Sequence, residues 1–265
     1  MVLKISRNGA GQSTRIYHVA YAPDIRKAYF FFWGCNLSCR GCLCKKEINC
    51  LALEENLDAV FRDPLLRPPQ SPGQFLALKG LVQLLDGIAL DEVAFEGQEA
   101  TVDPSLPDIC RWLKERKCRV VLHTNGVRLA DVSHIDDVIV SLKAVTPALY
   151  QEYTSLSNQF VLGNFNYYYQ AGVNLKAESV FIPGYIGLDE IERIASFIAG
   201  VDRKIPYRID AYFESGDNPW RPPSAEELKE AVGVARRHLD NVYSTQQTKR
   251  DLKKEDLSYQ VQRLY

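Results

Sequence analysis

Three cysteines at short spacing are the residues of this sequence that most directly suggest chemistry. Cys35, Cys39 and Cys42 follow an apolar, aromatic run at 29–33 that ends at Gly34. Such a run has the length and composition of a buried strand. The thiols therefore fall in the loop just past a strand, where a rigid scaffold commonly carries its functional residues. Three thiolate ligands in one short loop predict a metal centre.

Two kinds of metal site are compatible with three thiols. A structural zinc site takes four ligands, usually as two separated pairs, and Cys44 and Cys50 are the near candidates for a fourth. A cubane iron–sulfur cluster held by three cysteines leaves one iron without a protein ligand, and catalytic metal sites keep such an open position. The spacing favours the cluster, and a zinc-stabilised binding module without chemistry is the remaining alternative.

A second stretch with functional potential is Glu96-Gly97-Gln98-Glu99, at the end of a predicted strand. Glycine lets the backbone approach a ligand closely, and a carboxylate accepts hydrogen bonds from an ammonium group. The structural alternative is a turn glycine between surface acids. The position just after a strand favours a ligand-binding role.

Strand and helix patterns alternate along most of the chain. The expected strands are 29–33, 91–97, 119–126, 137–143, 174–184 and 208–213. The expected helices are 51–61, 72–86, 104–117, one starting at Thr146-Pro147, 158–170, 189–199, and one from Ser224 to Asp240 with a Ser224/Glu227 capping box. Six strands alternating with helices imply right-handed βαβ units and a parallel α/β sheet, with ligand chemistry at the C-terminal ends of the strands.

Composition limits the function further. The 265 residues are 46% hydrophobic and 25% charged, which is typical of a globular enzyme-sized domain. The net charge, 32 minus 33, is −1, so nothing indicates a nucleic-acid or anionic-membrane partner. No apolar run approaches the roughly 18 residues of a spanning helix, and the N-terminus lacks a signal-peptide pattern. Seven cysteines, three of them clustered, favour the reducing cytoplasm.

The spacing Cys-x-x-x-Cys-x-x-Cys resembles that of the radical SAM superfamily. The order of the other motifs is similar to its pyruvate formate-lyase activating enzyme group over about residues 15 to 240. The matching positions after the cysteines are Gly97, Gln98 and Glu99 for the Gly-Gly-Glu element, Asn125 in a Thr-Asn-Gly turn, Ser141 and Lys143 for Asp-x-Lys, Val180 in 180–184 for the stretch against the adenine, and Tyr212 for Pro-Tyr-His.

This resemblance implies a partial (βα)6 barrel of the TIM type, open on one side. It implies a [4Fe-4S] cluster on Cys35, Cys39 and Cys42, whose open iron binds the amino and carboxylate groups of S-adenosylmethionine (SAM). It also implies that an electron from a flavodoxin- or ferredoxin-type reductant cleaves SAM, under anaerobic conditions, to a 5′-deoxyadenosyl radical. Activating enzymes then abstract hydrogen from a protein or peptide.

Several positions depart from the pattern of that group. Gly41 stands where an aromatic residue is usual, Phe213 replaces a histidine, and Glu178 aligns with an arginine. Because these positions lie near the substrate side, a radical SAM enzyme that modifies a small metabolite or nucleoside remains the alternative function.

We expect residues 1–240 to form the barrel, with an N-terminal extension 1–27 and a cluster loop 34–50, followed by a polar surface tail 241–265 that could include a helix. The remaining cysteines (Cys44, Cys50, Cys110 and Cys118) are expected to be buried structural thiols. The histidines at 18, 134 and 238 are expected to be ordinary surface or capping residues.

Overall fold

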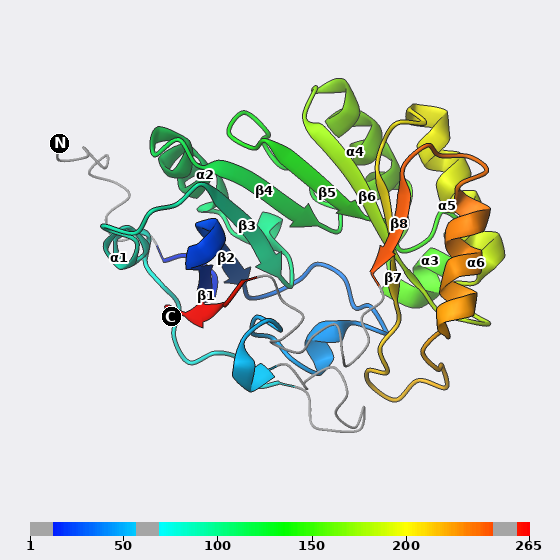
Figure 1. Ribbon diagram of the computed structural model, residues 1–265, viewed down its shortest axis with the longest axis horizontal. Helices are drawn as coiled ribbons and strands as arrows, with labels where there is room; N and C mark the ends of the chain where they lie inside the picture. The colour runs from blue at the N-terminus through cyan, green and yellow to red at the C-terminus, as the bar shows by residue number, and fades with distance from the viewer. Residues whose placement is uncertain (1–12, 57–68, 246–258) are drawn as a thin grey trace.

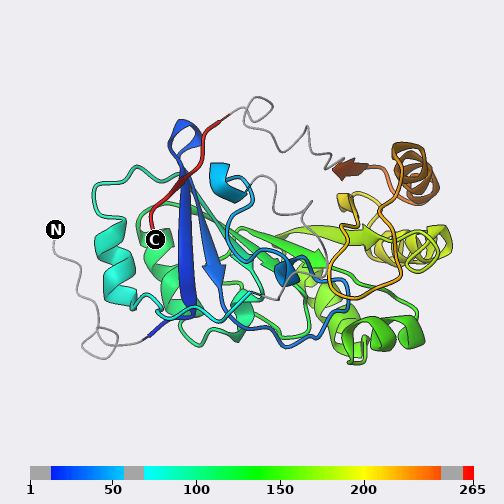
Figure 2. The ribbon, with the colours of Figure 1, turned by 90° about the horizontal axis from the view of Figure 1, so that it is seen from below.

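The computed structural model describes residues 13–56, 69–245 and 259–265. Their strands form one sheet in the order β8-β7-β6-β5-β4-β3-β2-β1-β9 (Figures 1 and 2). The strands are β1 Ile16–Ala22, β2 Lys27–Phe32, β3 Glu92–Gly97, β4 Arg119–Thr124, β5 Asp137–Ser141, β6 Asn174–Phe181, β7 Tyr207–Ala211, β8 Val242–Thr245 and β9 Gln262–Arg263. The order has two ends, β8 and β9, so the barrel is partial and open, as expected.

The neighbouring strands from β2 to β8 all pair in parallel, whereas β1 pairs antiparallel with β2 and β9 antiparallel with β1. Parallel strands require crossover connections, and the intervening helices supply them. The carboxyl ends of β2 to β8 therefore meet along one edge. The loop that follows β2 lies beyond the arrowheads of these strands in Figure 1.

Helices cover the outside of the curved sheet (Figure 1). They are α1 Leu78–Leu84, α2 Leu106–Glu115, α3 Pro147–Thr154, α4 Gln159–Gln170, α5 Leu188–Val201 and α6 Ala225–Ala235. The main apolar core lies between helices and sheet and includes Phe30, Phe95, Ile109, Phe165 and Ile198, each fully buried. The predicted capping box at Ser224 and Glu227 is present at the start of α6.

Two segments in which no strand was expected contribute strands to the sheet. The predicted N-terminal extension 1–27 contains β1, whose seven residues are all buried. The predicted polar tail contains β8, which extends the parallel array beyond the six expected strands, and β9 at the opposite end. These two strands were not predicted because both are short and pair through their backbones, so they show little hydrophobic periodicity in the sequence.

Two local expectations were also wrong. Of the helix expected over 51–61, residues 57–61 lie outside the described residues, and the rest contains only a 3₁₀ turn at Glu54–Asn56. His18 was expected to be a surface or capping residue, but it is fully buried within a strand, and its Nδ1 lies 2.6 Å from the carbonyl oxygen of Tyr265. His18 lies in the interior because strand β1, to which it belongs, is covered on both faces.

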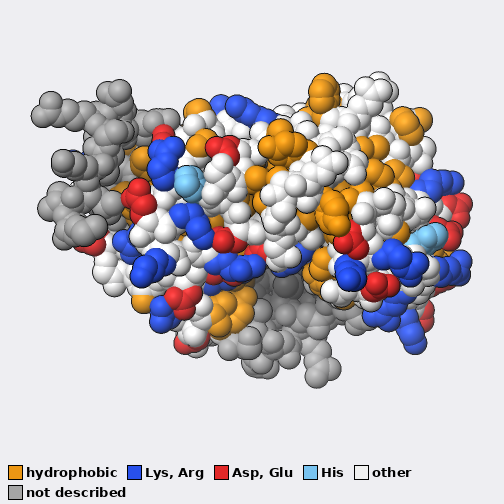
Figure 3. Space-filling view, turned by 90° about the horizontal axis from the view of Figure 1, so that it is seen from above, with side chains coloured by type: hydrophobic (Ala, Val, Ile, Leu, Met, Phe, Trp, Pro, Cys, Tyr) orange, Lys and Arg blue, Asp and Glu red, His pale blue; other side chains and the backbone are white. Residues whose placement is uncertain are grey.

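Side chains of both charge signs are interspersed on the face seen in Figure 3, with apolar side chains between them. This distribution agrees with the net charge of −1. Within the described part of the chain, no helix combines the length and the apolar character needed to cross a bilayer.

Candidate active site

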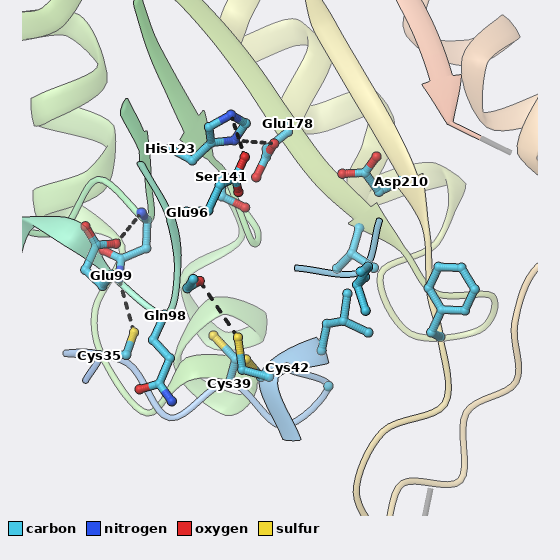
Figure 4. A pocket seen from close by; sticks show the side chains of 18 of the residues that line it. Cys35, Cys39, Cys42, Glu96, Gln98, Glu99, His123, Ser141, Glu178 and Asp210 are labelled. Carbon is cyan, nitrogen blue, oxygen red and sulfur yellow. Dashed lines mark hydrogen bonds and ion pairs between the residues drawn. The ribbon is translucent and has the colours of Figure 1, made fainter. Parts of the chain in front are cut away.

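A cavity of about 490 Å³ lies at the carboxyl ends of the parallel strands. All the residues that the sequence nominated line it: Cys35, Cys39, Cys42, Gly97, Gln98, Glu99, Asn125, Ser141, Lys143, Val180 and Tyr212. Figure 4 shows the three cysteines on one side of this cavity, with His123, Glu178 and Asp210 on the other. The fold therefore brings together residues from segments that are more than a hundred positions apart.

The loop that carries the cysteines is held against α3. The backbone amide of Ser38 donates to the carbonyl of Thr154 at 3.1 Å, and that of Arg40 donates to Tyr153 at 2.9 Å. The Arg40 guanidinium also lies 4.7 Å from the centre of the Trp220 ring and pairs with Glu152 at 2.9 Å. These contacts fix the loop before any ligand is bound.

The donor set fits an iron–sulfur cluster. All seven cysteines lie in described segments and none forms a disulfide, so the thiols are available. Among the residues that the structure describes, no three metal-binding side chains converge as a single ion would require. A cubane presents a separate iron to each cysteine, so its ligands need not converge.

The thiols differ in their ionisation. Burial raises the pKa of Cys39 to about 11 and also raises that of Cys35. A hydrogen bond from Cys44 lowers the pKa of Cys42 to about 6, against the effect of burial. A metal centre requires thiolates, and the buried ammonium group of Lys143 favours that form at all three positions.

Gly41, one of the departures, has a steric explanation. A Cβ atom there would lie 2.8 Å from Cε2 of Tyr212 and 3.0 Å from the hydroxyl of Tyr153. The space that an aromatic residue would need is already filled by aromatic rings from other elements. Tyr212 and Tyr153 are both buried in a small apolar cluster apart from the main core, and Val180 packs against this cluster. Aromatic side chains from other segments thus occupy the space next to Gly41 that an aromatic residue of the loop itself would need.

Gly97 could not be replaced without moving the backbone. Its φ is +93°, and a Cβ atom would lie 2.9 Å from the backbone nitrogen of Phe32. The next residue, Gln98, accepts a hydrogen bond from the amide of Gly34 at 2.8 Å. The end of β3 is therefore tied directly to the start of the cysteine loop.

A second connection to the cysteine loop runs through Glu99 and Asn125. We term the chain of contacts from Glu99 through Asn125 to Cys35 the amide link. Glu99 is 2% exposed, and its Oε2 accepts the Asn125 amide at 2.7 Å. Its Oε1 accepts three bonds, from the amide and hydroxyl of Thr101 and from the hydroxyl of Thr124. Asn125 Nδ2 then lies 3.5 Å from the sulfur of Cys35. Glu99 is thus bonded mainly to the protein itself.

Ser141 and Lys143 lie at the end of β5. The Lys143 ammonium donates to the Ser141 hydroxyl at 2.5 Å. Burial lowers the pKa of Lys143, but the nearby Cys39 and Glu178 outweigh it and raise the pKa overall. A lysine held charged beside three thiols can stabilise an anionic cluster or a ligand carboxylate.

Sequence reasoning missed a group of charged side chains inside the barrel. Arg208 lies 2.5 Å from Glu178 and 2.9 Å from Asp210. His123 lies 3.8 Å from Glu178 and 3.4 Å from Glu96. We term these five residues the charged ladder. The sequence did contain an indication of this group, because charged residues stand at alternate positions of the predicted strands. Burial of a charged side chain costs free energy unless the charge is paired, so such residues commonly mark a functional site.

The fields within the charged ladder are strong. Burial raises the pKa of Glu178, but His123, Arg208 and Lys143 hold it well below its usual range. Burial lowers the pKa of His123, but Glu96 and Glu178 raise it overall. Burial raises the pKa of Asp210, and Arg208 opposes that rise. The ladder therefore holds several charges inside the barrel.

Comparison with known proteins identifies the family. Residues 29–198 match the model of the Radical SAM superfamily. A Methanocaldococcus jannaschii protein named "Putative glycyl-radical enzyme activating enzyme" is 28% identical over 251 residues, which cover 92% of this chain and 89% of that protein.

Solved structures share the fold. The chain superposes on a domain of pyruvate-formate lyase-activating enzyme from Bacteroides vulgatus with a TM-score of 0.52 and 16% identity, over 58% of this chain and 99% of that one. It also superposes on Streptococcus suis SuiB bound to the precursor peptide SuiA, with a TM-score of 0.59 and 12% identity, over 80% of this chain and 46% of SuiB. The chain thus spans about half of SuiB. On the family match, the chain belongs to the Radical SAM superfamily, whose enzymes use a [4Fe-4S] cluster and SAM.

Proposed function

We propose that this radical SAM enzyme abstracts hydrogen from a protein or peptide substrate, as activating enzymes do. The observation that carries the proposal is the convergence of Cys35, Cys39 and Cys42 with Gly97 and Lys143 on one cavity. The similarity to the M. jannaschii relative along nearly its whole length supports the choice of substrate class. The family match sets aside the zinc-stabilised binding module.

We assign the three cysteines as the cluster ligands and the other nominated residues as the SAM site. When bound, the cluster supplies the electron that cleaves SAM to methionine and a 5′-deoxyadenosyl radical. The main-chain groups at Gly97 can approach the methionyl end closely because no side chain intervenes. Lys143 is placed to bind the SAM carboxylate or ribose, and Val180 and Tyr212 provide apolar surface for the adenine. These residues position the reacting bond, and positioning supplies much of the rate.

Stray hydrogen donors must be kept from a carbon radical, and a closed site with an aromatic and apolar lining around the cysteines serves that purpose. The open side of the barrel would then be closed by the substrate. A loop of another protein suits such an opening. We further propose that the enzyme works in the cytoplasm under anaerobic conditions with a flavodoxin- or ferredoxin-type reductant, which agrees with seven cysteines free of disulfides.

The test is SAM cleavage by anaerobically reconstituted protein under dithionite, with 5′-deoxyadenosine measured by chromatography. We expect slow formation alone and faster formation with substrate, and none in a Cys39→Ala variant. An intact, reducible cluster without SAM cleavage would defeat the proposal. A glycyl radical signal on a co-encoded glycyl-radical enzyme would support the protein substrate directly.

Modification of a small metabolite or nucleoside is the second candidate. The charged ladder favours it, because a belt of charges inside the barrel suits a compact polar ligand. Acceleration of deoxyadenosine formation by a small molecule, with no effect of any co-encoded protein, would select this candidate.

A further inference from the structure

The order of acidic and basic side chains along the charged ladder indicates what kind of ligand it can bind. Along it the side chains run Glu96, His123, Glu178, Arg208, Asp210, so that carboxylates alternate with basic groups. Each basic group lies between two carboxylates. Direct register places Glu178 of β6 opposite Arg208 of β7, so the rigid sheet holds this spacing.

The ladder begins and ends with a carboxylate, and it is therefore one positive charge short. Three acids face Arg208 and His123, and the charge deficit remains even when His123 is protonated. Lys143 acts electrostatically on Glu178 and also on the three cysteine thiols, but among the described residues it forms no ion pair with a carboxylate of the ladder. An uncompensated carboxylate in a partly buried site is costly unless a cation joins it.

The two ends of the ladder differ in how well they are satisfied. Asp210 is chelated by Arg208 and also accepts the Thr245 hydroxyl at 2.5 Å. Within the described ranges Glu96 pairs only with His123, through Oε1, and no donor lies within hydrogen-bonding distance of its Oε2. Its side chain is 31% exposed, and Glu96 lines the cavity. The deficit is therefore located at Glu96.

The surroundings of Glu96 suit a cation. Tyr29 and Phe31 of β2 line the same cavity, and β2 pairs with β3 so that Phe31 is in register with Glu96. The ammonium group of Lys27 already lies 5.0 Å from the centre of the Tyr29 ring, so Phe31 is the ring that remains for a ligand beside Glu96. Aromatic faces attract ammonium and guanidinium groups, and a carboxylate pairs with either. An acid with a free oxygen, next to aromatic rings and facing a cavity of about 490 Å³, is a cation-binding arrangement.

We propose that Glu96, with Phe31, is a subsite for a cationic group of the substrate, an ammonium or a guanidinium. This inference rests on the proposed function in that the occupant is the molecule from which hydrogen is abstracted. The cation could belong to a lysyl or arginyl side chain of a protein loop or to a free amine, and both present the same chemistry to Glu96.

The test compares isosteric probes on the reconstituted, SAM-loaded enzyme by anaerobic equilibrium dialysis. The probes are acetyl-Gly-Arg-Gly-amide, its neutral citrulline counterpart, and agmatine as the free amine. The variants are Glu96→Gln and, as a control that leaves Lys27 and Tyr29 undisturbed, Asp108→Asn, whose carboxylate pairs with Arg111 on the outer helix α2. Circular dichroism and iron content establish that each variant is folded and loaded.

We expect the arginine peptide to bind the wild type at least tenfold more tightly than the citrulline peptide. The preference should vanish in Glu96→Gln and persist in Asp108→Asn. Agmatine binding more weakly than the peptide would indicate a protein loop, and tighter binding would indicate a free amine; both support the cation subsite.

Equal binding of the charged and neutral peptides by the wild type would overturn the inference, as would a preference that survives Glu96→Gln. Loss of SAM affinity in Glu96→Gln with peptide affinity retained would assign the carboxylate to the SAM ammonium and would also overturn it. Deoxyadenosine formation is measured in parallel. If SAM is cleaved but the peptides bind equally, only the subsite fails, whereas absence of cleavage defeats the proposed function.

Discussion

Glu96 and Glu99 are three residues apart at the end of β3, yet they lie in opposite environments. Glu99 is 2% exposed and accepts four hydrogen bonds from the protein. Glu96 is partly exposed to the cavity, and among the residues that the structure describes its one ion-pair partner is His123. The first carboxylate completes the framework of the cysteine end, and the second remains open toward the interior of the barrel.

The two carboxylates typify the two ends of the cavity. The cysteine end is built from loops and backbone groups, tied together by the amide link. The other end is built from strand side chains that face inward, the charged ladder. Fixed hydrogen bonds suit a cofactor that must be placed in one orientation. Charges that are only partly compensated suit a ligand that contributes the missing charge.

The largest effect is expected at the cysteine end. Cys39→Ala should abolish cluster binding, because three thiolates are needed to hold three irons. Cys110→Ala is the matched control, since Cys110 is a buried thiol of the outer core. Iron and labile sulfide analysis after anaerobic reconstitution should give about four of each per chain in the wild type and control. Zinc without labile sulfide in the wild type would contradict the cluster.

The second prediction compares the carboxylates directly. Glu99→Ala should lower the free energy of unfolding of the apoprotein by about 3 kcal/mol or more, because buried donors of Thr101 and Asn125 lose their acceptor. Glu96→Ala should change it by only about 0.5 kcal/mol, as partly exposed sites do. Urea denaturation followed by circular dichroism measures both. Similar losses in the two variants would show that Glu99 is not the more tightly integrated residue.

Much of the fold was predictable because parallel strands and outer helices leave strong hydrophobic patterns. The strands from β2 to β7 and most helices lie where the pattern placed them. The cysteine end was predictable for a related reason: its residues follow strand ends in fixed order, and only Gly fits at Gly97 with its positive φ. Such features are local in sequence.

The charged ladder was not predictable, because its contacts depend on register. Glu178 meets Arg208 only because β6 and β7 pair at those residues, and His123 meets both Glu96 and Glu178 across the curved sheet. Strands β8 and β9 and the burial of His18 depend likewise on pairing between distant segments. A one-residue change in register would reverse every inward side chain, and sequence alone does not fix register.

A third prediction tests whether the ladder acts as one unit. Arg208→Met should destabilise the protein by about 2 kcal/mol, because Glu178 and Asp210 lose the guanidinium that pairs with both of them. Access to the cavity keeps the loss below that of a fully buried pair. Glu178→Gln should be milder alone and should partly rescue Arg208→Met. A double-mutant cycle in urea measures the coupling. Additive losses would mean that these charges act independently.

The smallest expected effect is a change in the pKa of His123. This pKa depends directly on the carboxylate of Glu96. Burial lowers the pKa of this imidazole, but Glu96 and Glu178 raise it above its ordinary value overall. Glu96→Gln removes one of these anions, so the pKa of His123 should fall in the variant. A raised folded-state pKa contributes stability that is fully present below the unfolded pKa and is lost as pH rises through the folded one. The wild type should therefore gain stability relative to Glu96→Gln in mildly acidic solution, and the difference should fade with rising pH.

Proton NMR titration of the imidazole Cε1 signals measures this change, with His123→Gln assigning the resonance among four histidines. His18 is an internal reference, because burial lowers its pKa to about 4 and Glu96 is not among the groups that act on it. Its titration should be the same in wild type and variant. If the His123 pKa does not move in Glu96→Gln while that of His18 also stays fixed, the carboxylate and imidazole are not coupled, and Glu96 is not the open end of a continuous ladder.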